Sequence, residues 1–237
     1  MANGEDLTDL QAVDFALGGV IAGAYEGLAD AGPQAFRRFL ARPVKEKIYF
    51  VQNDDIQKVL RKVAGRENEP GRPMPDLPLI AYYREQGVAA DPNQPVCLLY
   101  TSDAVRFVNE ERVWGMDKAM RLTTIPVALT YSILMLGWDR ATLDRMTLAW
   151  FGYIAPLYRK HSRFVVPYVL DGERVEVRAS ISAPREVLTS SEPMADDGKR
   201  LWGARTMVEV TTQALYGVTT QIQDYLTVGG VAEILGA

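Results

Sequence analysis

The sequence predicts an α+β fold, with a mixed, mostly antiparallel sheet, two or three packing helices, and N- and C-terminal extensions. Three observations lead to this fold class. Residues 125–135 place apolar side chains with period two, which is typical of a strand with one buried face. An amphipathic helical pattern follows at 139–154, and Asp171-Gly172 then joins two extended runs as a tight hairpin turn does.

The composition is that of an ordinary globular protein with a small negative charge. Hydrophobic residues make up 48% and charged residues 24% of the 237 positions, which is close to average and argues against wholesale disorder. The net charge of −4 provides no basic field for a nucleic-acid backbone, so a duplex-binding role is not expected. The apolar run at 10–28 contains Asp14 and Glu26, so we expect neither a secretion signal nor a membrane-spanning helix there.

The chain is expected to form one sizeable domain with extensions. The expected domain is an α+β domain at 44–217, preceded by an N-terminal helical arm at 1–43 and followed by a C-terminal extension at 218–237. Small residues dominate 7–31 and would let another backbone approach closely. This segment fits a helix that packs on another subunit, and equally a helix that packs on its own core.

After a short basic piece at 36–40, the pattern indicates a strand and then a helix. Residues 44–52 have the β-branched and aromatic character of a strand. Asp54 or Asp55 can cap the amphipathic helix that follows, and prolines keep 66–78 in an extended loop.

Two short strands come next, at 79–83 and 96–101, with a turn-rich stretch between them. Residues 102–115 suit either a helix or a strand, and the pattern leaves both open.

The long strand and the helix after it are the best-defined elements of the sequence. Pro126 lies inside the strand and cannot donate to a ladder, so it should mark a bulge or face an unpaired side. Asp139 is expected to cap the helix, and Pro156 to stop it. The apolar stripe of this helix consists of Leu143, Met146, Trp150 and Ile154, which we interpret as core.

The hairpin around Asp171-Gly172 predicts its own register. With a two-residue turn, one face pairs Tyr168 with Val175, Val166 with Val177, and Phe164 with Ala179. Pro167 then occupies a non-hydrogen-bonded position, so its strand should be a sheet edge or be bulged on its outer side. Such an edge is a candidate junction between subunits, and equally an exposed edge that proline protects from pairing.

The end of the chain is predicted to hold a polar loop, a last strand and a tail. Residues 184–199 are rich in serine, aspartate and glycine, which is typical of a loop. Residues 206–216 alternate with period two as a strand, and 218–237 lack a firm period and are interpreted as an extension.

No pattern of catalytic, cofactor-binding or metal-ligating residues emerges. His161 is the only histidine, and no phosphate-binding loop or nucleophile elbow is present in the sequence. Capping explains Asp54 and Asp55, and the lone Cys97 is interpreted as a buried apolar residue in a reducing compartment. We therefore expect no enzyme activity, no cofactor and no bound metal.

The block 121–216 resembles the tail-terminator and tail-completion (neck) proteins of contractile-tailed, T4-like bacteriophages, including their sheath-stabilising proteins. The features that carry the resemblance are Arg121, the Ile125-Pro126 pair, the strand and helix that end at Pro156, and the hairpin. The final strand is opened by Gly198-Lys199-Arg200-Leu201-Trp202 and ends at Leu215-Tyr216-Gly217. The block covers about 40% of the chain. The apolar segment near the N-terminus and residues 102–115 depart from the family pattern.

The resemblance implies a structural virion protein, assembled in the host cytoplasm. It would form a ring, typically a hexamer, that ends the tail tube and sheath and joins them to the neck and head connector, and DNA would pass through without specific binding. Alternatives are a baseplate or head-completion component of the same fold and, from a different class, a small-molecule-binding domain or an enzyme. Residues expected at subunit or partner contacts are Phe164, Val166, Pro167, Tyr168, Trp202 and Tyr225.

Overall fold

The computed structural model describes residues 10–28, 32–52, 77–85, 87–90, 118–155, 162–170, 173–184, 186–193 and 200–221. Three α-helices and one sheet of eight strands are found in these ranges, which confirms the predicted α+β class. The helices are α1 (Leu10–Gly23), α2 (Gln34–Ala41) and α5 (Arg140–Ile154), with a 3₁₀ turn at Val44–Glu46. The strands are β1 (Ile48–Phe50), β2 (Leu79–Arg84), β3 (Ala89–Ala90), β4 (Lys118–Gly137), β5 (Arg163–Leu170), β6 (Glu173–Ile181), β7 (Val187–Pro193) and β8 (Arg200–Gln221).

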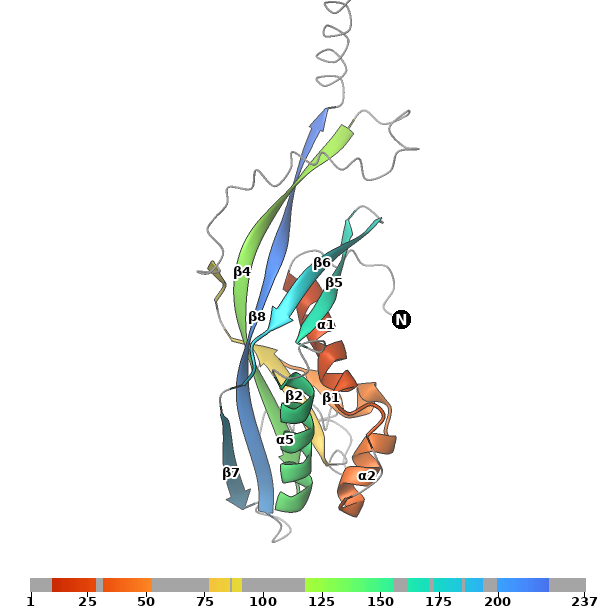
Figure 1. The fold of residues 1–237 in the computed structure, drawn as a ribbon, viewed down its shortest axis with the longest axis vertical. Helices are drawn as coiled ribbons and strands as arrows, with labels where there is room; N and C mark the ends of the chain where they lie inside the picture. Colours follow the sequence, from red (N-terminus) through yellow and green to blue (C-terminus); the bar gives the residue numbers. More distant parts are fainter. Residues whose placement is uncertain are drawn as a thin grey trace, which may run out of the picture.

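The sheet is mixed and mostly antiparallel, as predicted. Its main path runs β1-β2-β4-β8-β6-β5, with β3 beside β4 and β7 beside β8. Among the described pairs, only β1 and β2 run parallel. The two long strands lie at the centre of the path, so every other strand is positioned directly or indirectly on them (Figure 1).

Strands β4 and β8 pair without interruption from Lys118↔Gln221 to Gly137↔Trp202. The predicted buried row is confirmed, because alternate residues of each strand are buried and point toward the helices. The buried rows consist of Leu129, Tyr131, Ile133 and Met135 on β4 and of Thr206, Val208 and Val210 on β8. On β4 the opposite row is also buried near its end, where Leu134 and Leu136 join a second, smaller core on the other face of the sheet.

Pro126 causes no bulge, since the β4–β8 register runs unbroken through it. The Glu85 amide donates to the Thr130 carbonyl, so the even-numbered residues of β4 direct their backbone groups away from β8. On that side, the described pairing with β3 stops at Val127. The missing N–H of Pro126 therefore faces an unpaired edge in the described part of the chain, which is the second of the two predicted possibilities.

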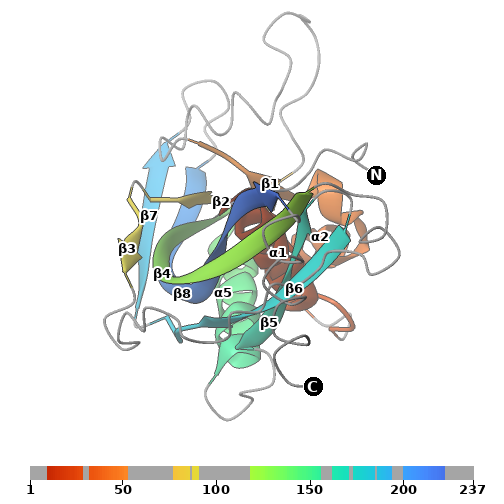
Figure 2. The ribbon, with the colours of Figure 1, turned by 90° about the horizontal axis from the view of Figure 1, so that it is seen from above.

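The three helices and the sheet share one large core (Figure 2). Leu17 and Ile21 of α1 and Trp150 of α5 are fully buried, and Asp139 caps α5 by accepting from the Thr142 amide at 2.7 Å. Burial of each such side chain contributes about 1.5–3 kcal/mol. Of the two possibilities for the apolar N-terminal segment, the structure shows the second: α1 packs on the core of its own chain.

The β5–β6 hairpin has the register that its turn predicts. Tyr168 pairs with Val175, Val166 with Val177, and Phe164 with Ala179. Strand β5 ends the path of the sheet. The Ile181 amide donates to the Ser162 carbonyl, so even-numbered residues of β5 bond toward β6, and Pro167 directs its missing N–H outward.

Several short elements were predicted incorrectly, only in part, or not at all. The expected loop at 184–199 contains β7, which pairs with β8 from Val187↔Thr206 to Pro193↔Arg200. The basic piece at 36–40 lies in α2, where Phe36 and Phe39 are buried. The strand expected at 44–52 is present but shorter, since a 3₁₀ turn occupies Val44–Glu46 and β1 contains three residues. These elements depend on backbone pairing and tertiary packing rather than on a strong local pattern.

Other predictions lie outside the described residues. They concern the helix after Asp54 and Asp55, the segments 96–101 and 102–115, and the positions of Cys97, Pro156 and His161. Strand β8 continues to Gln221, past the point at which the C-terminal extension was expected to begin.

The outer halves of β4 and β8 form a two-stranded ribbon. Residues 118–125 pair with 214–221, and no other described strand pairs with either segment. Eight residues per strand correspond to about 27 Å at the usual rise. Figure 1 shows the ribbon projecting beyond the helices and beyond the β5–β6 hairpin.

Candidate functional site

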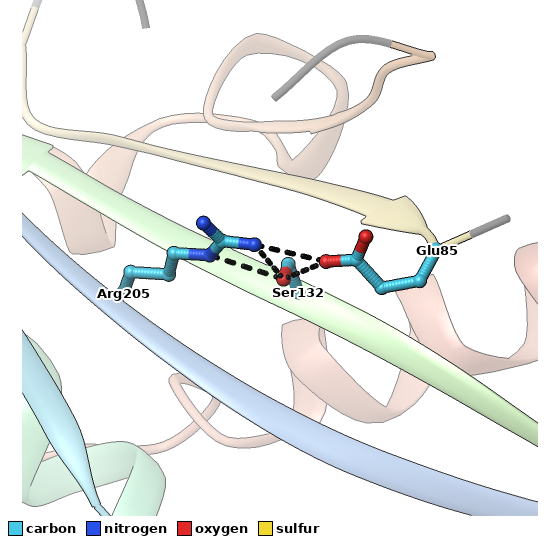
Figure 3. Close-up of polar contacts among 3 residues, drawn as sticks. All are labelled: Glu85, Ser132 and Arg205. Carbon is cyan, nitrogen blue, oxygen red and sulfur yellow. Dashed lines mark hydrogen bonds and ion pairs between the residues drawn. The ribbon is translucent and has the colours of Figure 1, made fainter. Parts of the chain in front are cut away.

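A polar cluster joins three neighbouring strands on the face of the sheet away from the helices (Figure 3). The Ser132 hydroxyl donates to Glu85 Oε1 at 2.6 Å and accepts from Arg205 Nη2 at 3.0 Å. Arg205 Nη2 also lies 2.9 Å from Glu85 Oε1, and its guanidinium stands 5.8 Å from the centre of the Tyr83 ring. Glu85 follows β2, Ser132 lies on β4 and Arg205 on β8, so the cluster clamps these strands together.

The geometry of this clamp suits a structural role better than nucleophilic catalysis. Ser132 is fully buried, and its hydroxyl already donates to a carboxylate and accepts from a guanidinium. It is therefore not presented to a substrate as an activated nucleophile would be.

A second polar cluster fixes α1 to the sheet. The Tyr131 hydroxyl donates to Asp14 Oδ1 at 2.6 Å, Arg84 Nη1 lies 3.3 Å from the same oxygen, and the Tyr82 hydroxyl donates to the Asp14 carbonyl at 3.0 Å. Burial raises the pKa of Asp14, although the hydrogen bond from Tyr131 and the charge of Arg84 act in the opposite direction. Burial also raises the pKa of Tyr131, and the hydrogen bond to Asp14 adds to this rise.

This cluster holds α1 in place, and its carboxylate is largely shielded from solvent. Asp14 is only 6% exposed. The close approach also explains Gly18, since an added Cβ there would lie 2.4 Å from the Tyr82 hydroxyl oxygen. The only signal in the sequence was a single aspartate inside an apolar run.

The predicted contact residues occupy different environments. Val166 and Tyr168 are buried in the core of their own chain, and the Tyr168 hydroxyl donates to the Gln213 carbonyl at 3.1 Å. Phe164 and Trp202 are partly buried against the same core. Pro167 lies on the outer strand β5, and Tyr225 is outside the described residues. The hairpin thus groups Phe164 with Val166, Pro167 and Tyr168. Trp202 lies away from them, near the start of β8, where it pairs with Gly137.

The accessible features of the molecule are sheet edges and scattered apolar side chains. Strands β1 and β5 end the main path of the sheet. Three exposed apolar residues lie in grooves on the face away from the helices, namely Val165, Leu188 and Met207, which are 46%, 63% and 51% exposed. Sequence reasoning missed them, although Met207 does stand out as an apolar residue in the otherwise polar row of its strand.

Charge is distributed unevenly along this face. A groove of about 490 Å³ is lined by Arg163 and Arg178. A groove of about 530 Å³ is lined by Glu186 and Glu209, together with Arg205, which Glu85 already pairs. The other two arginines and the two groove-lining glutamates are exposed, and the described residues form no ion pair with any of these four. The face therefore offers charges of both signs to a partner.

No protein-family model matches this chain, and no curated protein matches it. Within the described ranges, no cluster of three or more histidine, cysteine, aspartate or glutamate side chains could hold a metal ion. None of the helices in these ranges is long and apolar enough to cross a membrane.

Proposed function

We propose that this protein is a non-enzymatic structural subunit of a contractile phage tail. In this proposal, copies of the chain form a ring that ends the tail tube and sheath and joins them to the neck. The resemblance of 121–216 to tail-terminator proteins supplies the biological role, and it suggests six subunits. The ring would lie in the virion, after assembly in the host cytoplasm.

The projecting β4–β8 ribbon is the observation that carries the proposal. A two-stranded ribbon without further support is at best marginally stable in water. Residues 118–125 and 214–221 have no other described strand beside them, so a neighbouring subunit is well suited to cover them. Because the ribbon projects from the body, it can reach a neighbour without moving the core (Figure 1).

The open sheet edges provide a second kind of contact. Strand β5 ends the sheet on one side and β1 on the other, so each subunit has two different edges. A closed ring requires two different surfaces that meet head to tail. Pro167 removes one outward donor from β5, which limits uncontrolled strand addition at this edge.

The first experiment measures assembly of the purified full-length chain. Light scattering coupled to size exclusion, together with negative-stain electron microscopy, should detect rings, either free or bound to the ends of isolated tail tubes. A protein that remains monomeric at every concentration, and that binds no tube ends, would exclude the proposal.

The second experiment tests the ribbon itself. In β4, odd-numbered residues direct their N–H toward β8, so Thr123→Pro removes a bond inside the ribbon and should prevent ring formation. Ala183→Pro, in the exposed coil between β6 and β7, serves as the matched control and should leave rings intact. Circular dichroism checks that the body stays folded. Normal rings with Thr123→Pro would show that the ribbon is not needed for assembly.

A further inference from the structure

The face of the sheet away from the helices carries opposite charges in a symmetric arrangement about Val210. Val210 pairs with Ile181 at the point where β6 joins β8. Arg178 lies three residues from Ile181 along β6, and the Thr212 hydroxyl donates to its carbonyl. On the other side, Glu186 precedes the Val187↔Thr206 pair, and its carbonyl accepts from the Thr206 hydroxyl at 2.9 Å.

Arg178 and Glu186 are therefore displaced in opposite directions from Val210 and lie on the same flank of β8. Three residues of a strand span about 10 Å, so each charge lies roughly that far from the centre. A twofold rotation about an axis that passes above Val210, parallel to the sheet and perpendicular to its strands, places Arg178 of one copy opposite Glu186 of the other. It also turns the face of one copy toward the same face of the other.

We propose that this face binds the same face of a second copy, and that Arg178 of each copy pairs with Glu186 of the other. Glu209 lies beside Glu186 in the acidic groove, so the incoming guanidinium meets two carboxylates. The same rotation brings exposed Met207 and Leu188 toward the β5–β6 hairpin of the second copy, which carries exposed Val165. Apolar area is thereby covered together with the charges.

Neighbouring charges on the face are compatible with this pairing. Arg205 lies at the acidic end, but Glu85 and Ser132 already hold its guanidinium (Figure 3). Glu176 lies next to Arg178 on the exposed row of β6 and does not line the basic groove. The contact is isologous and closes on itself, so it is independent of the head-to-tail ring proposed above.

Charge reversal provides a specific test. Glu186→Arg makes both ends of the face positive, and Arg178→Glu makes both ends negative. In a pair formed by one variant, both contacts between residues 178 and 186 bring like charges together. A pair that contains one copy of each variant restores opposite charges at both contacts. Exposed ion pairs contribute about 0.2–1 kcal/mol each, so two reversals should weaken self-association by roughly tenfold or more.

Sedimentation velocity of the full-length protein at low salt separates monomers, pairs and rings by size. We expect pairs, either of single chains or of rings, for the natural sequence, unpaired chains or unpaired rings for each variant alone, and pairs that contain both variants in equal amounts for their mixture. The matched controls Glu26→Arg and Arg38→Glu change the same charges at exposed positions of the helical layer and should not affect pairing.

Three results would overturn the proposal. They are a natural protein that forms no pairs, variants that pair as well as the natural protein, and a mixture that stays unpaired or grows into longer alternating chains. Rings observed alongside any of these results would leave the ring proposal standing, because the ring depends on the β4–β8 ribbon and the sheet edges rather than on the Arg178–Glu186 pairs.

Discussion

Replacing either of two adjacent glycines of α1 should have opposite effects on stability. An alanine Cβ at Gly18 would lie 2.4 Å from the Tyr82 hydroxyl oxygen, about 1 Å closer than ordinary contact, and 3.2 Å from the ring carbon that bears it. Tyr82 cannot easily move, because it is 5% exposed and its hydroxyl donates to the Asp14 carbonyl. At Gly19, an added Cβ meets nothing within 4 Å.

The expected magnitudes follow from two opposing effects. Glycine to alanine inside a helix stabilises by about 1 kcal/mol, so Gly19→Ala should raise the free energy of unfolding by up to that amount. Gly18→Ala has the same gain but also an overpacking cost of about 1–3 kcal/mol. It should therefore be about 1–3 kcal/mol less stable than Gly19→Ala.

Urea unfolding monitored by circular dichroism measures this difference directly. Tyr82→Phe removes the clashing oxygen, so Gly18→Ala should cost much less in that background than alone. If Gly18→Ala stabilises as much as Gly19→Ala, then α1 does not pack on β2 of its own chain as described, and the close approach at Tyr82 is refuted.

Three further predictions concern buried groups. Burial raises the folded-state pKa of Asp14, so its contribution to stability is largest at low pH and is lost as pH rises through the folded pKa; urea midpoints of Asp14→Asn should lack this decline. Trp150→Ala removes the largest fully buried side chain in the described part of the chain and should lower the free energy of unfolding by about 3–5 kcal/mol, as measured in the same urea assay. Ser132→Ala should cost only about 1 kcal/mol, since Arg205 and Glu85 still bond directly; a loss above 3 kcal/mol in a thermal melt would contradict this.

The elements with strong local signals were predicted accurately. Asp171-Gly172 sets the hairpin register, because a shift of one residue would move Val166 and Tyr168 to the opposite face. Helix α5 follows from the Asp139 cap and from a stripe that the structure shows to be buried. In these elements, local preference and tertiary packing agree.

Elements held by their surroundings could not be predicted. Strand β7 is polar, and Leu188 on it is 63% exposed; what makes it a strand is the free edge of β8 beside it. Helix α2 has only eight residues, and its phenylalanines gain their partners, such as Tyr25, from α1 and the turn after it.

The arrangement of charges on the face of the sheet away from the helices also could not be predicted from the sequence. Arg178 and Glu186 are brought to opposite sides of Val210 by the way that β6 and β7 share one edge of β8. Ordinary polar alternation explains each residue on its own, and only the register shows their symmetry. The same holds for the clamp of Glu85, Ser132 and Arg205, whose members are far apart in the chain.

The ribbon also determines how the molecule would bear mechanical load. Strand β4 begins and β8 ends at the same tip, where Lys118 pairs with Gln221. Tension that pulls these two positions apart would break the ladder one pair at a time, like a zipper, and would need little force. Tension between the ribbon and the body acts along the strands and loads many backbone bonds together in shear. A subunit built in this way transmits axial pull into its core, yet opens readily when the two strands are drawn sideways at the tip.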